Sequence, residues 1–226
     1  MFPVLKMDFL ISLICLCVMV IFAEAQITNE GPCFNFKGDS YLHFTPNNFD
    51  SNNSIHYTIK FRTLQDNGIL MYARGRQGDD EALFIKNGKL QFHLFNTAAT
   101  GIEGYFGAHL EGDETVNIDK WITVHVYRSW EHYDKKQRRM RKKTGFEVQI
   151  DGNLYSHVDY FQRSDISIQP PIYFGGYRES LSSTLSNFIG QIKDISEEKN
   201  KFTFENPSLN YGSRVEVSCV ESEAQN

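Results

Sequence analysis

Cysteine is scarce in this sequence, which has four cysteines in 226 residues. Together with the seven histidines they form no Cys/His spacing of a zinc site, and no H-E-x-x-H motif occurs. The G-x-S-x-G turn of α/β-hydrolases is also missing. The sequence therefore lacks the short motifs of zinc hydrolases and of serine hydrolases of that class.

Long apolar runs are equally rare. The one that occurs, Phe9–Ala23, has fifteen residues, follows Lys6 and ends in the small-x-small pattern Ala23-Glu24-Ala25. A transmembrane helix needs about 20 apolar residues, so an uncleaved anchor is the less favoured alternative. We expect residues 1–25 to be a signal peptide and residues 26–226 to be a secreted, extracellular domain with no membrane span.

Secretion restricts the partners and the cysteine chemistry. The whole sequence has a net charge of −5, and a secreted protein does not meet intracellular nucleic acid. We therefore expect its partners to be extracellular and not nucleic acid. Cleavage of the signal peptide leaves Cys33 and Cys219, an even pair that suggests one disulfide joining the first and last strands. Asn52-Asn53-Ser54 predicts surface glycosylation at Asn52.

No segment has the period of a long amphipathic helix, and alternation with a period of two dominates instead. Strands are expected at Ser54–Leu64, Gly68–Ala73, Ala82–Phe95, Trp121–Trp130, Gly145–Val158, Ile172–Gly176 and Phe188–Ile195. Asn87-Gly88 and Asp151-Gly152 are typical of tight hairpin turns. This pattern predicts an all-β sandwich of two antiparallel sheets.

The strand Trp121–Trp130 illustrates the alternation. Ile122, Val124 and Val126 share one apolar face, and the opposite face is mixed. We expect Trp121 to belong to the core rather than to a ligand site.

Seven segments, in order, resemble the laminin G-like (LNS) domain family. They are FKGDSYLHF (Phe36–Phe44), IKFRTLQDNGILMYARG (Ile59–Gly75), GDDEALFIKNGKL (Gly78–Leu90), DKWITVHVYR (Asp119–Arg128), FEVQIDG (Phe146–Gly152), IYFGG (Ile172–Gly176) and FIGQI (Phe188–Ile192). The resemblance implies a jelly-roll sandwich of about fourteen strands, with a core at about 33–219. It also implies a non-enzymatic recognition module for heparan sulfate or other sulfated glycans, sulfated lipid, or matrix and cell-surface proteins.

Two features of the family bear on single residues here. Gln191 stands where the family often has a cysteine that pairs near the C-terminus, so Cys219 has lost that partner and Cys33 remains. Many members bind one Ca²⁺ at a rim of the sandwich, and the resemblance assigns Asp79 and Asp165 as its acidic ligands. Asp80 and Glu81 are adjacent alternatives, and the competing interpretation is that Asp79 and Asp80 are ordinary loop acids that follow Gly78.

A dense basic run interrupts the acidic chain. Seven cations fall within nine residues: Lys135, Lys136, Arg138, Arg139, Arg141, Lys142 and Lys143. We expect Glu131–Thr144 to be a long loop between two strands, kept unpacked by repulsion until it binds a sulfated glycosaminoglycan. A solvated loop without a partner, and a protease site cut after Arg139 or Lys143, stay open as alternatives.

The alternative function is a glycosidase or a neutral-sugar lectin, because both also use sandwich architectures. A glycosidase needs clustered carboxylates on one strand. In Glu111–Val116, alternation places Glu111, Asp113 and Thr115 on one face, which leaves two carboxylates and no third. The sequence therefore favours a binding module over an enzyme.

Overall fold

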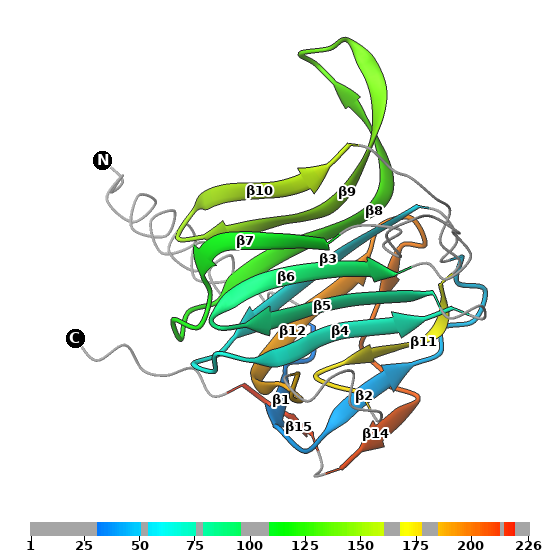
Figure 1. Cartoon of the computed structure of the whole chain (residues 1–226). Helices are drawn as coiled ribbons and strands as arrows, with labels where there is room; N and C mark the ends of the chain where they lie inside the picture. Colours follow the sequence, from blue (N-terminus) through cyan, green and yellow to red (C-terminus); the bar gives the residue numbers. More distant parts are fainter. Residues whose placement is uncertain are drawn as a thin grey trace, which may run out of the picture. The chain divides into compact units, whose positions relative to one another are not determined.

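The computed structural model describes residues 31–50, 54–75, 79–95, 109–160, 168–177, 185–212 and 215–219. Within these ranges the chain forms fifteen strands in two antiparallel sheets and no helix (Figure 1), which confirms the predicted sandwich of about fourteen strands. No helix suited to crossing a membrane occurs in this part of the chain. The expected signal peptide, Asn52 and Asp165 lie outside the described residues.

The first sheet contains eight strands in the order β10-β9-β8-β3-β12-β1-β15, with β13 paired to β12. Its strands are β1 (Phe34–Lys37), β3 (Ile55–Arg62), β8 (Ile122–Asp134), β9 (Arg139–Ile150), β10 (Asn153–Asp159), β12 (Ile189–Glu197), β13 (Phe202–Thr203) and β15 (Glu216–Val217).

The second sheet contains seven strands in the order β14-β2-β11-β4-β5-β6-β7. Its strands are β2 (Tyr41–Phe44), β4 (Gly68–Arg74), β5 (Asp80–Lys86), β6 (Lys89–Phe95), β7 (His109–Thr115), β11 (Gln169–Phe174) and β14 (Leu209–Tyr211).

The core lies between the two sheets and follows from alternation along the strands. In β3 the residues Ile55, Tyr57, Ile59 and Phe61 are fully buried, and the residues between them are partly exposed. The turns follow the sequence signals too, because Asn87-Gly88 and Asp151-Gly152 both have positive φ at both positions. Local sequence therefore positions these strands and their hairpins.

One core assignment was wrong. Ile122, Val124 and Val126 are buried as expected, but Trp121 is only partly buried and does not belong to the buried core. The ammonium of Lys193 lies 4.8 Å from the centre of the Trp121 ring, in a cation–π contact. Alternation explains the difference, since the residue before Ile122 must face the other side of the sheet.

The two ends of the described chain are joined. Cys33 and Cys219 form the predicted disulfide, with Cα atoms 5.5 Å apart. Phe34 and Asn35 in β1 pair with Val217 and Glu216 in β15, so the first and last strands are neighbours, as expected.

The expected long loop at Glu131–Thr144 was also wrong. Strand β8 continues to Asp134, β9 begins at Arg139, and these two residues are paired, so residues 135–138 alone form the turn. The register shifts between Tyr127 and Trp130, where Ser129 has a φ of 51°. Beyond this bulge the two strands project from the sandwich as a twisted ribbon (Figure 1). We call Trp130–Lys143 the β8–β9 ribbon.

Candidate functional site

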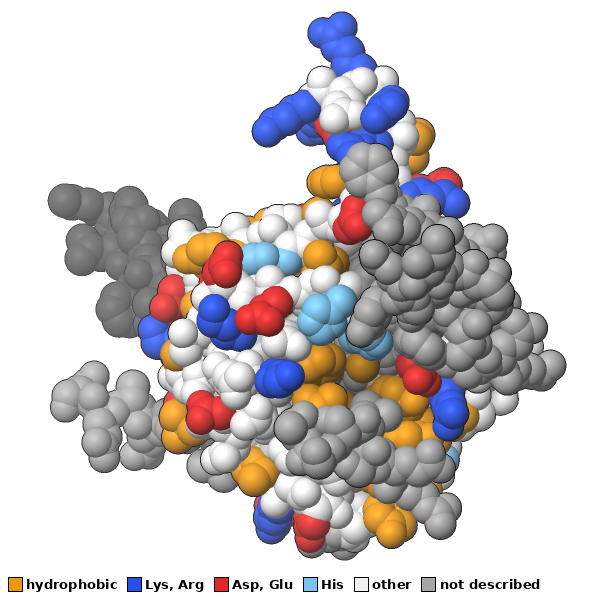
Figure 2. Space-filling view, viewed as in Figure 1, with side chains coloured by type: hydrophobic (Ala, Val, Ile, Leu, Met, Phe, Trp, Pro, Cys, Tyr) orange, Lys and Arg blue, Asp and Glu red, His pale blue; other side chains and the backbone are white. Residues whose placement is uncertain are grey.

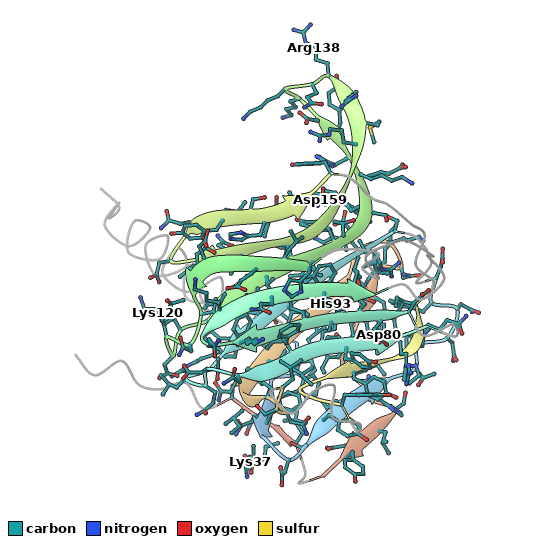
Figure 3. The ribbon with its side chains drawn as sticks, in the orientation of Figure 1. Lys37, Asp80, His93, Lys120, Arg138 and Asp159 are labelled. Carbon is teal, nitrogen blue, oxygen red and sulfur yellow. A yellow bond between two sulfur atoms is a disulfide. The ribbon has the colours of Figure 1, made fainter. Side chains whose placement is uncertain are left out.

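The β8–β9 ribbon carries all seven residues of the predicted glycan site. Figure 2 shows blue side chains gathered around its projecting end, and Figure 3 places Arg138 at the outermost point. Five of the seven cations are exposed, namely Lys135, Lys136, Arg138, Arg139 and Lys142. The structure thus brings most of the predicted site together on one projection.

Four of these cations form the ribbon tip, which we define as Lys135, Lys136, Arg138 and Arg139. No described acidic side chain lies within ion-pair distance of any of them, and Arg139 donates from Nε to Gln137 Oε1 at 3.1 Å. Unpaired surface cations of this density attract anions, because the charges add at short range.

Asp134 shapes the turn that displays the tip. Its Oδ1 accepts hydrogen bonds from the backbone N–H groups of Lys136 at 2.9 Å and Gln137 at 3.0 Å. The hydrogen bond from Gln137, followed by that from the Arg141 side chain, holds the pKa of Asp134 below its ordinary value. These hydrogen bonds therefore favour the ionised form of Asp134 beneath the tip.

Arg141 is part of the ribbon's structure rather than of its exposed charge. Its Nη1 donates to Asp134 Oδ2 at 3.0 Å, and its guanidinium lies 3.7 Å from the centre of the Tyr160 ring. A guanidinium combines well with a carboxylate at its edge and an aromatic ring at its face.

Lys143 is held in the same way at the base of the ribbon. Its Nζ lies 3.1 Å from Glu147 Oε2 and 3.6 Å from the centre of the Tyr127 ring, and the Tyr127 hydroxyl donates to the same carboxylate at 2.7 Å. Burial opposes ionisation of Glu147, yet the hydrogen bonds from Tyr127 and Lys143 lower its pKa. Two of the seven predicted contact residues, Arg141 and Lys143, thus have internal roles.

The ribbon also exposes an apolar pair that sequence reasoning missed. Tyr133 and Met140 face each other across the two strands and are 57% and 59% exposed. Their alternation with charged residues would have indicated a paired ribbon, had the segment not been assigned to a loop.

The rim that the family resemblance assigned to calcium is described only on one side. Asp79 is 3% exposed, and its carbonyl accepts from the backbone N–H of Gly75 at 2.7 Å. The adjacent acids have other partners: Tyr72 donates to Asp80 Oδ1 at 2.7 Å, and Glu81 pairs with Arg128 between the sheets. Within the described ranges no three His, Cys, Asp or Glu residues are grouped to hold a metal.

The two carboxylates considered for glycosidase chemistry are surface residues of β7. Glu111 and Asp113 are exposed, and Glu111 Oε2 accepts from Gln91 Nε2 at 2.9 Å.

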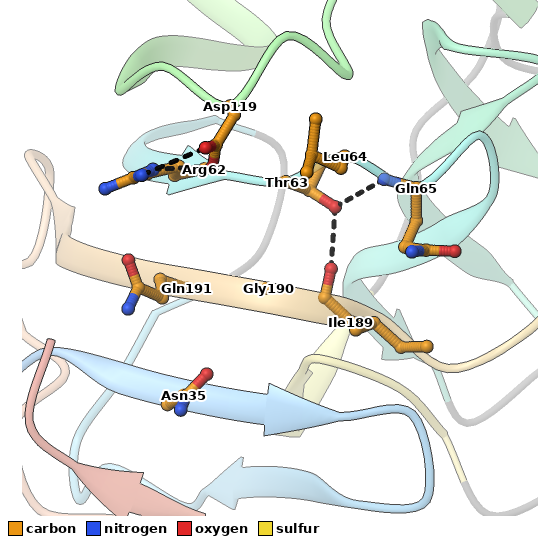
Figure 4. Close-up of a pocket in the computed structure, with 9 residues that line it drawn as sticks. All are labelled: Asn35, Arg62, Thr63, Leu64, Gln65, Asp119, Ile189, Gly190 and Gln191. Atoms are coloured by element: carbon orange, nitrogen blue, oxygen red, sulfur yellow. Dashed lines mark hydrogen bonds and ion pairs between the residues drawn. The ribbon is translucent and has the colours of Figure 1, made fainter. Parts of the chain in front are cut away.

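A pocket of about 280 Å³ lies between β1, β3 and the start of β12 (Figure 4). Its cation, Arg62, donates to both carboxylate oxygens of Asp119, at 2.8 and 3.1 Å. Gln191, which stands where the family often has a cysteine, lines the same pocket. Because Asp119 neutralises the guanidinium of Arg62, this pocket is a poorer anion site than the ribbon tip.

Comparisons with known proteins agree with this architecture. The model of the laminin G domain matches residues 61–199. The mouse laminin subunit alpha-1 is 22% identical over 165 residues, which is 71% of this chain and 5% of that protein. Human usherin is 26% identical over 177 residues, covering 74% of this chain and 3% of that protein. The chain thus spans only a small part of these relatives.

Solved structures show the same fold. Domains LG4-5 of the mouse laminin alpha1 chain superpose with a TM-score of 0.60 at 16% identity, covering 81% of this chain and 46% of that one. The LG1-3 region of the laminin alpha2 chain gives a TM-score of 0.58 at 17% identity, covering 84% and 35%. The family model matches more than half of this chain, and the chain therefore belongs to the laminin G domain family.

Proposed function

We propose that this chain is a secreted, extracellular, non-enzymatic recognition module that binds sulfated glycosaminoglycan, such as heparan sulfate, through the ribbon tip. The observation that carries the proposal is the separation of the tip from the sandwich. Four exposed cations, none with an acidic partner among the described residues, occupy the end of a projecting ribbon in a chain of net charge −5.

The chemistry of the tip fits sulfate groups. Arginine presents a planar fork of donors that matches an oxyanion, and lysine adds a mobile point charge. Lys142 adds a fifth cation, because its 3.7 Å contact with Glu131 joins two exposed groups and contributes little. Binding of several sulfates would release counterions, by analogy with other polyanions.

Protein partners are a second part of the proposal. The relatives include laminin alpha chains and usherin, which supports a matrix or cell-surface protein as a partner of this domain.

Replacing the four residues of the ribbon tip by serine and glutamine should abolish retention on heparin at physiological salt. The loss of four contacts should also lower the slope of log affinity against log salt by roughly 3, by analogy with nucleic acids. The melting temperature should not change, because none of the four packs in the core. Elution from heparin-agarose across a salt gradient measures retention, and thermal unfolding checks the fold.

The matched control removes four cations outside the ribbon, Lys37, Lys86, Lys120 and Lys201, by substitution with glutamine. This control has the same net charge as the tip variant and should keep most of the heparin retention. Equal elution of the two variants would mean that overall charge, not the tip, determines binding. Recovery of a natural secreted chain cut after Arg139 or Lys143 would instead favour proteolytic processing of the ribbon.

We also propose Ca²⁺ at the rim, with Asp79 and Asp165 as acidic ligands, supported by the nearly buried carboxylate of Asp79. If the dissociation constant is near 1 mM, 10 mM Ca²⁺ should stabilise the fold by about 1.4 kcal/mol, which for a domain of this size is a rise of about 3–6 °C in melting temperature.

Differential scanning fluorimetry in Ca²⁺ and in Mg²⁺ measures this calcium effect. Asp165→Asn should remove the rise, whereas Asp80→Asn should keep it, because Asp80 is engaged by Tyr72. A melting temperature that responds equally to both cations would count against a calcium site.

A further inference from the structure

Two histidines face each other on the outer surface of the seven-stranded sheet, away from the ribbon. His93 on β6 and His109 on β7 are directly paired across the strands, and their Nδ1 atoms are 3.3 Å apart. Figure 3 labels His93 near the middle of this sheet, and Figure 2 shows histidine side chains on the same face. His109 is exposed and His93 is partly exposed, so solvent reaches the pair.

The distance between the two Nδ1 atoms matches the distance between two nitrogen ligands of one metal ion. A tetrahedral ion with metal–nitrogen bonds of about 2.0–2.1 Å holds two of its nitrogen ligands roughly 3.3 Å apart. Two neutral imidazoles can satisfy that distance with one proton between them, or with a cation bound to both lone pairs. The rings are already oriented with the same nitrogen of each facing the other.

The surroundings favour a cation. Burial, followed by the proximity of His109, lowers the pKa of His93, and Asp80 opposes this shift. Glu111 lies two residues from His109 on the same strand and is exposed. A carboxylate on the same strand as His109 helps to attract a divalent ion to this face.

A second histidine pair in the molecule shows what distinguishes this one. The rings of His56 and His125 are 5.6 Å apart, close to the 5.5 Å of His93 and His109. There, however, His125 Nδ1 is engaged by the Thr58 hydroxyl at 3.0 Å and His56 Nδ1 by the carboxylate of Glu198. A similar ring spacing therefore does not by itself place two nitrogens where one metal ion could bind both.

We propose that His93 and His109 form a binding site for a borderline transition-metal ion, with Zn²⁺ as the physiological candidate. Imidazole is a preferred ligand of Zn²⁺, Ni²⁺ and Cu²⁺, whereas Ca²⁺ requires oxygen ligands. The described residues supply no third ligand. The remaining coordination positions are taken by water or by a donor of a bound partner, which makes this an open site rather than a structural one.

Isothermal titration of the tag-free chain with ZnCl₂ at pH 7.5 tests the site. One Zn²⁺ should bind per chain, and a large excess of Ca²⁺ should leave the affinity unchanged. His109→Gln and His93→Gln should each weaken binding by more than about tenfold, since even loss of a group behind a metal ligand lowers affinity by about 10–100-fold. His125→Gln, the matched control from the other histidine pair, should bind Zn²⁺ like the unmodified chain.

His109 is exposed, so its substitution leaves the core intact and keeps the test valid if His93→Gln proves unstable. The proposal is overturned if His109→Gln binds Zn²⁺ as tightly as the unmodified chain, if His125→Gln weakens binding to the same extent, or if the unmodified chain binds no Zn²⁺. Displacement of Zn²⁺ by Ca²⁺ would also overturn it, because it would assign the ion to an oxygen-ligand site.

Discussion

Replacing Glu81 by alanine is expected to lower the free energy of unfolding by about 3–5 kcal/mol, the range for breaking a buried ion pair. Glu81 Oε1 lies 3.3 Å from Nε of Arg128, and both side chains are 0% exposed. The pair joins β5 in one sheet to β8 in the other, so its loss leaves a guanidinium between the sheets without this carboxylate. Burial raises the pKa of Glu81, while Arg128 acts in the opposite direction.

The measurement is urea unfolding of Glu81→Ala beside a surface control. Lys120→Ala removes the Lys120–Asp151 pair, which is shorter at 2.8 Å but 57% and 59% exposed. Solvent screening limits such a pair to about 0–1 kcal/mol. If Glu81→Ala destabilises the chain no more than Lys120→Ala, the site tolerates the loss of this carboxylate, and burial does not strengthen the pair.

Most of the sandwich could be predicted because its strands obey local rules. The period of two in Ile55–Arg62 and the Asn-Gly and Asp-Gly turns depend on neighbouring residues alone. The disulfide could be predicted from the two cysteines that remain beyond the expected signal peptide.

The ribbon could not be predicted because its stability comes from partners that only strand pairing reveals. Counting seven cations indicated repulsion, whereas the fold places Asp134 and Tyr160 against Arg141, and Glu147 and Tyr127 against Lys143. Each contact offsets part of the repulsion that the sequence alone suggested.

Long-range polar pairs were missed for the same reason. Glu81 was considered as an alternative calcium ligand beside Asp79, but its partner Arg128 is 47 residues away in the other sheet. His93 and His109 likewise come together only through the pairing of β6 with β7. Such pairs leave no periodic signal in the sequence, because the two residues become neighbours only through strand pairing or sheet packing.

Removing the Cys33–Cys219 disulfide should lower the free energy of unfolding about as much as Glu81→Ala does. This effect acts through the unfolded state, which gains conformational entropy. The bond joins residues 186 positions apart, and the chain-entropy model gives roughly 5 kcal/mol for a loop of that length. For a domain of this size, each 1 kcal/mol corresponds to about 2–4 °C in melting temperature. Cys33→Ser/Cys219→Ser should therefore melt about 10–20 °C below the oxidised chain.

Loss of β15 docking is the competing explanation, because β15 has only two residues and pairs with the β1 strand that follows Cys33. Lys37→Ala tests it by removing the 2.8 Å contact with Glu216 while keeping the disulfide. Its effect on the free energy of unfolding should be small, since solvent screens the attraction between two exposed groups. Hydrogen exchange separates the two explanations: an entropic effect accelerates exchange through global unfolding in the buried strands β3 and β8, whereas simple undocking accelerates it at β1 and β15 alone. Exchange confined to those two strands, with an unchanged melting temperature, would show that the bond only fastens the chain end.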